Sequence, residues 1–119
     1  MLNFKDLAIW QRSHKLTIEI YRATLKFPKE EIYGLTSQIR RAVASIPTNI
    51  AEGCGRRTNA ELANFLNIAS GSASEVEYEI LLAKEVGYIT AEQCELWMKE
   101  IGEIRSMLAA YMKRLKTEH

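Results

Sequence analysis

Cysteine, histidine, proline and glycine are all scarce in this 119-residue sequence. The two cysteines, Cys54 and Cys94, are too few for a disulfide scaffold or for a zinc site built of cysteines alone. Neither His14 nor His119 lies at ligand spacing from a cysteine, so no metal site is predicted. The two prolines and six glycines interrupt the chain rarely, which favours long helices.

Long hydrophobic runs are also missing. No apolar segment approaches the roughly 20 residues that span a bilayer, so no membrane contact is predicted. The opening MLNFKDLAIW contains Asp6 and no apolar core of signal-peptide length, which indicates a cytoplasmic protein. The length fits one domain, which we place at residues 1–119.

Motifs for catalysis and nucleotide binding are absent as well. The glycines at 53 and 55 lack the following Lys-Ser/Thr of a phosphate-binding loop and follow no predicted strand. No Glu-x-x-His pair occurs, which excludes a di-iron carboxylate bundle, and two histidines do not assemble into a catalytic triad. We therefore predict no enzyme activity, no cofactor and no small-molecule substrate.

Hydrophobic residues do recur at helical spacing through most of the chain. We expect helices over residues 6–27, from about 36 to 53, from the capping box Thr58–Glu61 to Gly87, and from the capping box Thr90–Gln93 to about 116. Four such helices joined by short loops predict an all-α fold, an antiparallel up-down-up-down four-helix bundle.

The second of these helices contains the stretch around which the chain is organised, residues 38–57. Pro47 lies inside it and cannot donate to the Val43 carbonyl, but the apolar spacing continues in phase, so we predict a proline-kinked helix. Ser45 and Thr48 are expected to satisfy the loosened turn. Gly53 and Gly55 are expected to end the helix in left-handed geometry. The apolar spine consists of Ile39, Val43, Ile46 and Ile50.

For the first and third helices, the sequence also predicts which side chains are buried and which are exposed. In the first helix the expected buried stripe has Ile18 beside it and runs through Leu7, Trp10, His14, Thr17, Tyr21 and Thr24 or Leu25. In the third helix, Gly71 is expected to allow close approach of a neighbouring helix. Glu75, Glu77 and Glu79 are expected to form a solvated or intersubunit acidic face.

Charge is divided unevenly between the two halves of the chain. Residues 1–57 hold ten Lys/Arg against five Asp/Glu, and residues 58–119 hold six against ten. The division indicates either a basic face for a polyanion or helices of opposite sign that pack within one molecule or between subunits.

The arginines are the best functional candidates. Arg40, Arg41, Arg56 and Arg57 flank the central stretch, and Arg12 or Lys15 extends the predicted patch. Contacts from these residues to phosphates would give salt-dependent binding of weak sequence specificity. The alternative is that the arginines pair with Glu52, Glu61 or glutamates of a neighbouring subunit.

Four stretches of the sequence carry a family resemblance. They are FKDLAIWQRSHKL, FPKEEIYGL, QIRRAVASIPTNIAEGCGRR and FLNIASGSASEVEYEILLAKEVGYI, within roughly residues 4–89. They resemble the bacterial four-helix-bundle family whose founding members are encoded in intervening sequences of large-subunit ribosomal RNA genes, the 23S rRNA intervening sequence proteins. The resemblance implies a homopentamer, and a related accessory protein of diversity-generating retroelements works with nucleic acid and reverse transcriptase. It implies no settled biochemical activity.

Two hypotheses of function follow. The first is a non-catalytic, oligomeric protein that binds RNA or DNA through the basic patch, with RNA as the first suspect. The second is a protein-interaction scaffold that assembles through complementary charged helix faces. They differ in whether glutamates of the third helix pair with the arginines.

Overall fold

The computed structural model describes residues 2–117, and this part of the chain is helical without a strand. Its four α helices are α1 (Ala8–Ala23), α2 (Leu35–Cys54), α3 (Asn59–Glu85) and α4 (Ala91–Thr117). Three single-turn 3-10 helices cover Phe4–Asp6, Thr24–Lys26 and Lys29–Glu31. The predicted all-α class is confirmed.

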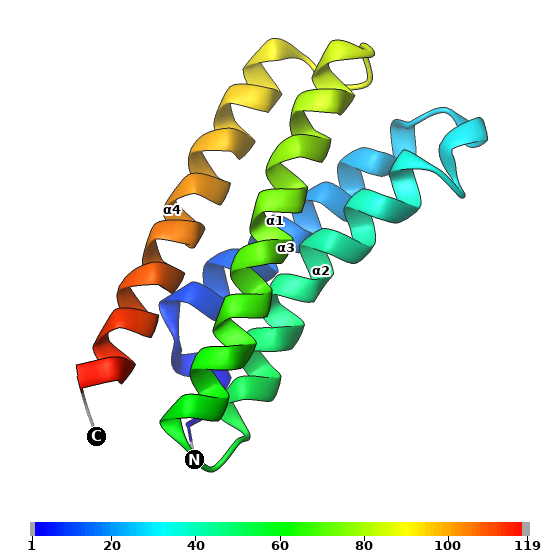
Figure 1. Cartoon of the computed structure of the whole chain (residues 1–119). Coiled ribbons are helices and arrows are strands. Elements are labelled where there is room, and N and C mark those ends of the chain that lie inside the picture. The colour runs from blue at the N-terminus through cyan, green and yellow to red at the C-terminus, as the bar shows by residue number, and fades with distance from the viewer. Residues whose placement is uncertain (1, 118–119) are drawn as a thin grey trace.

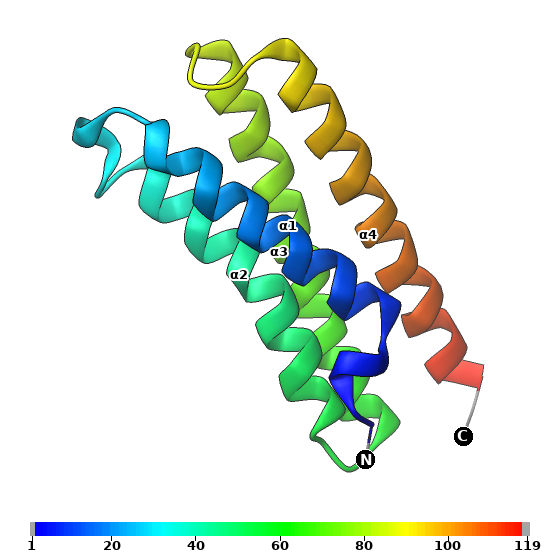
Figure 2. The same ribbon diagram turned by 180° about the vertical axis from the view of Figure 1, so that it is seen from behind.

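The helices lie along the long axis of a rod that measures 48 × 23 × 20 Å (Figure 1). Contacts join four pairs of helices: α1 and α2, α2 and α3, α3 and α4, and α4 and α1. In Figure 2, α1 lies in front of α2 and α3. The turn between α2 and α3 lies at the same end of the rod as the start of α1 and the end of α4. Segments from four parts of the sequence therefore meet at this end.

The predicted spine of α2 is confirmed. Its four members are fully buried in the main hydrophobic core, together with side chains from the other three helices. Burial of a side chain of this size contributes about 1.5–3 kcal/mol to the free energy of unfolding. The members of the spine are Ile39, Val43, Ile46 and Ile50.

Pro47 lies inside α2, and the helix continues through it to Cys54. The carbonyl that Pro47 leaves without a backbone donor is that of Val43. The hydroxyl of Thr17, on α1, lies 3.2 Å from this carbonyl oxygen and 2.7 Å from the Ser13 carbonyl, so it can donate to either. The donor for the Val43 carbonyl thus comes from α1. The Ser45 hydroxyl bonds Ser72 and Asn49 instead, so the prediction that Ser45 and Thr48 would serve this turn is wrong.

The buried face of α1 differs from the predicted stripe. His14 and Tyr21 are exposed, and the His14 ring stacks on Trp10 with the ring centroids 4.8 Å apart. The helix packs on α2 and α4 through the alternative set Ile9, Ser13, Leu16, Thr17 and Ile20. Thr17 belongs to both sets and Thr24 is also buried, so the prediction is confirmed at these two positions. Both sets have helical spacing, and the packing partners select the second over most of the helix.

Gly53 and Gly55 have different roles from those expected, whereas Gly87 ends the third helix as predicted. Gly53 lies within α2, where an added Cβ would be 2.9 Å from atoms of Leu62 and Phe65. Its lack of a side chain therefore allows α2 and α3 to approach closely. Gly55 has an ordinary φ of −84° and Gly87, which follows α3, has φ +85°. The Gly87 amide donates to Lys84 and the next amide donates to Ala83, which forms a Schellman ending.

Two expectations for α3 are also wrong. Gly71 is exposed, and an added Cβ would meet no described atom within 4 Å, so no helix of the same chain approaches it. Glu79 is 4% exposed, because it belongs to the inward stripe with Val76, Ile80 and Ala83. Of the three glutamates, Glu75 is exposed and Glu77 pairs with Arg105 of α4 at 2.9 Å.

Candidate nucleic-acid interface

Arg40 holds the end of α1. Its Nε donates to Thr24 Oγ1 at 2.8 Å, its Nη2 donates to the Tyr21 carbonyl at 3.2 Å, and its guanidinium lies 5.0 Å from the Tyr21 ring centroid. These partners are neutral, so the positive charge is retained. The side chain is nevertheless fixed in place by α1.

Arg41, the next residue, has a different environment. Its side chain is exposed, and it makes no hydrogen bond or ion pair within residues 2–117. Adjacent positions on a helix point about 100° apart, which is why Arg40 faces α1 and Arg41 faces solvent. Arg41 can therefore contact a polyanion at little structural cost.

Arg56 and Arg57 lie in the turn between α2 and α3. The Nη2 of Arg56 is 3.0 Å from Glu52 Oε2, and its guanidinium lies 4.8 Å from the Phe65 ring centroid. The pair with Glu52 is exposed, and such pairs contribute less than about 1 kcal/mol, so it is easily exchanged for a phosphate. Arg57 is exposed and has no partner in the described part of the chain.

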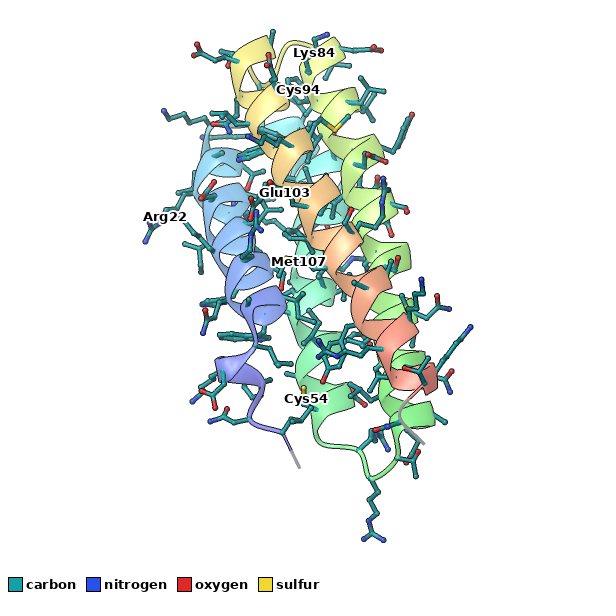
Figure 3. The ribbon with its side chains drawn as sticks, turned by 90° about the vertical axis from the view of Figure 1, so that its left-hand side faces the viewer. Arg22, Cys54, Lys84, Cys94, Glu103 and Met107 are labelled. Carbon is teal, nitrogen blue, oxygen red and sulfur yellow. The ribbon has the colours of Figure 1, made fainter. Side chains whose placement is uncertain are left out.

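Arg12 is engaged by two carboxylates of α4. Its Nη2 lies 2.6 Å from both Glu100 Oε1 and Glu103 Oε2, and its Nε donates to Glu100 at 3.0 Å. The hydrogen bonds to Glu100 and then Glu103 raise the pKa of Arg12 above its ordinary value. Figure 3 shows Glu103 and Met107 beside this seam between α1 and α4. Lys15 is exposed at the edge of a hollow of about 330 Å³ in the same seam.

The six candidate residues do not form one patch. About 21 Å of helix separates Arg40 from Cys54, the last residue of α2, at a rise of 1.5 Å per residue. Arg12 belongs to the α1–α4 seam. The structure brings Arg56 and Arg57 to the end of the rod where α4 finishes, and it places Arg40 and Arg41 in the other half of α2.

Sequence reasoning missed the contribution of α4 to this end. Two adjoining hollows of about 430 and 300 Å³ lie between the start of α3 and the end of α4. Asn64 lines both, and Asn67 and Lys113 line the larger one. Lys116 lines both hollows as well. The last turns of α4 carry an evident positive charge in the sequence, and only the folded arrangement places it beside the α2–α3 turn.

The described residues offer little for other chemistry. Within residues 2–117, no three His, Cys, Asp or Glu side chains gather closely enough to hold a metal ion. No helix in that range is both long and apolar enough to cross a membrane. Cys54 and Cys94 are buried free thiols, and burial raises the pKa of Cys54, which makes it less reactive.

Comparison with known proteins gives two findings. The model of the 23S rRNA-intervening sequence protein family matches residues 5–110. A crystal structure from Bacteroides thetaiotaomicron, described as a protein of unknown function from the S23 ribosomal protein family, is 29% identical with a TM-score of 0.80. The match covers 89% of this chain and 99% of that one. No curated protein matches the sequence.

Proposed function

Since the chain belongs to the 23S rRNA-intervening sequence protein family, we propose that it is a non-catalytic, cytoplasmic protein that binds RNA as a homo-oligomer, with the family resemblance favouring a pentamer. In this proposal the helices form an antiparallel up-down-up-down bundle with α2 bent at Pro47. The carrying observation is that Arg41 and Arg57 are exposed and have no ion pair or hydrogen bond within residues 2–117.

The geometry of Arg41 and Arg57 supports phosphate binding over internal pairing, whereas Arg56 forms the pair with Glu52 that the alternative predicted. Within residues 2–117, none of the four candidate arginines of the central stretch pairs with a glutamate of α3, since Arg40 binds α1 and Arg56 binds Glu52. An arginine of α4 does pair with α3, namely Arg105 with Glu77. Guanidinium groups bind phosphate oxygens through paired N–H donors. A few such contacts per subunit give weak binding, which a symmetric oligomer multiplies through avidity.

The end of the rod that carries Arg56 and Arg57 is the preferred contact surface. Arg12 would have to give up two carboxylate partners to bind a phosphate, and Arg40 would have to release the end of α1. Arg57 gives up no partner in the described chain. We therefore assign Arg56 and Arg57 the main phosphate contacts, with Arg41 as a second, separate contact.

The test is fluorescence anisotropy with labelled single-stranded and structured RNA across a salt series. Arg56→Ala with Arg57→Ala should weaken binding and flatten the dependence of log K on log salt by about 0.7–0.9 per lost phosphate contact. Arg22→Ala removes one charge at an exposed arginine of α1 that points away from the rod in Figure 3, and as a control it should leave binding unchanged. No binding at low salt, or no effect of the double variant, contradicts the proposal.

A second function is favoured by the exposed apolar side chains. On α3, which also carries Glu75, Ile68 and Tyr78 are 51% and 61% exposed. In the 3-10 helix Thr24–Lys26 that follows α1, Leu25 is 76% exposed beside Lys26. An acidic, partly apolar face of one subunit thus complements a basic, partly apolar face of another. The molecule would then serve as a protein-interaction scaffold.

Light scattering tests the scaffold. Glu75→Lys should reduce the assembly size if the α3 face is the contact, whereas Glu92→Lys, an exposed change at the start of α4, should not. An unchanged assembly in Glu75→Lys counts against this interface.

A further inference from the structure

A polar groove lies between α3 and α4, on the outside of the rod. The two adjoining hollows share Ala63, Asn64 and Lys116, so they form one continuous depression of the kind that holds small ligands or chain segments. Alanines line much of it and keep it open, and no carboxylate of residues 2–117 lines it. Those alanines are Ala60, Ala63 and Ala109.

Two amides and two ammonium groups face each other across this groove. Asn64 and Asn67 are one turn apart on α3, and Lys113 and Lys116 are one turn apart on α4. All four are exposed, and within residues 2–117 none makes a hydrogen bond or ion pair. Their hydrogen-bonding capacity is therefore available to a ligand, and the nearest carboxylate along α3, Glu61, is engaged by the Thr58 hydroxyl.

We propose that this α3–α4 groove binds a short segment of single-stranded RNA. The ammonium groups of Lys113 and Lys116 contact phosphates, and the amides of Asn64 and Asn67 pair with base edges. An amide carries both a donor and an acceptor, which suits the edge of a nucleobase. Arg57, two residues before α3, continues the positive charge from the groove to the contact surface of the proposed function, on which this inference rests.

The concave shape favours a single strand over a duplex. Base edges in an RNA duplex lie within grooves that a protruding side chain must enter, and single strands splay their bases outward. Here the amides line a hollow, so the base has to enter the protein. The apolar surface of Met112 and the alanines beside the amides offers contact for a base or ribose.

The test is anisotropy of a labelled 12-nucleotide single-stranded RNA and of its duplex, each over a salt series. Lys113→Gln with Lys116→Gln should weaken single-strand binding and lower the salt slope by about 1.4, from about 0.7 for each phosphate contact. Asn64→Ala with Asn67→Ala should weaken binding about tenfold, as expected for two ordinary hydrogen bonds, and leave the slope unchanged.

The matched control is Lys84→Gln with Lys99→Gln, which removes the same charge from exposed positions outside the groove. It should change binding far less than the Lys113 and Lys116 pair. Unfolding curves of all variants verify the fold, since every substituted side chain is exposed.

The outcomes separate the two proposals. If RNA binds and only the Arg56 and Arg57 variant weakens it, the proposed function stands and the groove assignment is overturned. Equal affinity for the duplex, or equal effects of the control lysines, also overturns it. Absence of RNA binding at low salt overturns both.

Discussion

At the residue scale, a single hydroxyl of α1 compensates for the proline in α2. Thr17→Val keeps the shape of the side chain and leaves the Val43 carbonyl buried without a donor. We expect a loss of about 1–3 kcal/mol in the free energy of unfolding, measured by denaturant titration.

Pro47→Ala supplies the second arm of a double-mutant cycle. Alanine restores an N–H that bonds to the Val43 carbonyl, so Thr17→Val should cost about 1 kcal/mol less in that background. The free-energy cost of losing the hydrogen bond from Thr17 to Ser13 is the same in both backgrounds, and the cost of any cavity left by Pro47 is the same with threonine or valine at position 17. Both costs therefore cancel when the two effects of Thr17→Val are subtracted. Equal costs in the two backgrounds would refute the role of Thr17.

Glu79 is the residue whose protonation should affect stability. Burial, and then the charge of Glu75, raises the pKa of Glu79 from 4.5 to about 7. The folded state therefore holds this proton more tightly than the unfolded state, and stability from this group is complete below pH 4.5 and is lost as the pH rises toward 7.

Glu79→Gln removes the charge at every pH. The variant should match the natural protein near pH 4.5 and be more stable at pH 8, by at most about 3 kcal/mol. Glu75→Gln, at an exposed neighbouring position, should reduce the pH dependence without abolishing it. Thermal unfolding between pH 4.5 and 8 measures this, and a constant difference across that range would be inconsistent with the raised pKa.

At the scale of elements, two glycines within helices should respond oppositely to the same substitution. Gly53→Ala places a methyl group 2.9 Å from Leu62 Cδ1 and Phe65 Cβ, and it should destabilise the protein by about 1–3 kcal/mol through separation of α2 and α3. Gly71→Ala meets open space and should stabilise α3 by about 0.5–1 kcal/mol.

Denaturant titration of both variants measures the contrast. Each change adds one methyl group in a helix, so the difference between them isolates the close approach at Gly53. Similar changes in the free energy of unfolding at the two positions would show that α3 can move away from α2 at little cost. Gly53 would then not set the distance between these helices.

Sequence patterns predicted the helices well where the information is local. The spine of α2 has one apolar stripe, and the Thr58 and Thr90 hydroxyls accept from the amides three residues later as their capping boxes indicate. Patterns failed for α1, where two stripes of helical spacing compete. They also failed at Gly53 and Gly71, because neighbouring helices decide which glycine is needed.

At the scale of the whole molecule, Arg12 joins α1 to α4 across the seam that contains the hollow at Lys15. Arg12→Gln should lower stability by about 1 kcal/mol, a modest value because the pairs are about one-third exposed. Hydrogen exchange should rise in α1 more than in α2 or α3. Lys15→Gln, an exposed neighbour, should leave exchange unchanged, and a uniform rise in all helices would argue against a seam-specific role.

Only part of the candidate nucleic-acid interface could be predicted from the sequence. The arginine pairs are visible as sequence, but whether each is bound depends on residues far along the chain: Arg12 meets Glu100, and Arg40 meets Thr24. The groove combines α3 and α4, whose asparagines and lysines are unremarkable when read separately. Long-range partners decide which charges remain for a ligand.

The Thr17 hydroxyl also has a consequence for the order of synthesis. Because α1 precedes α2 in the chain, the donor for Val43 has already been made when Pro47 leaves the ribosome. A circularly permuted protein that begins at α2 would receive that donor last. Such a permutant should fold more slowly than one opened between α3 and α4, although both contain the same four helices.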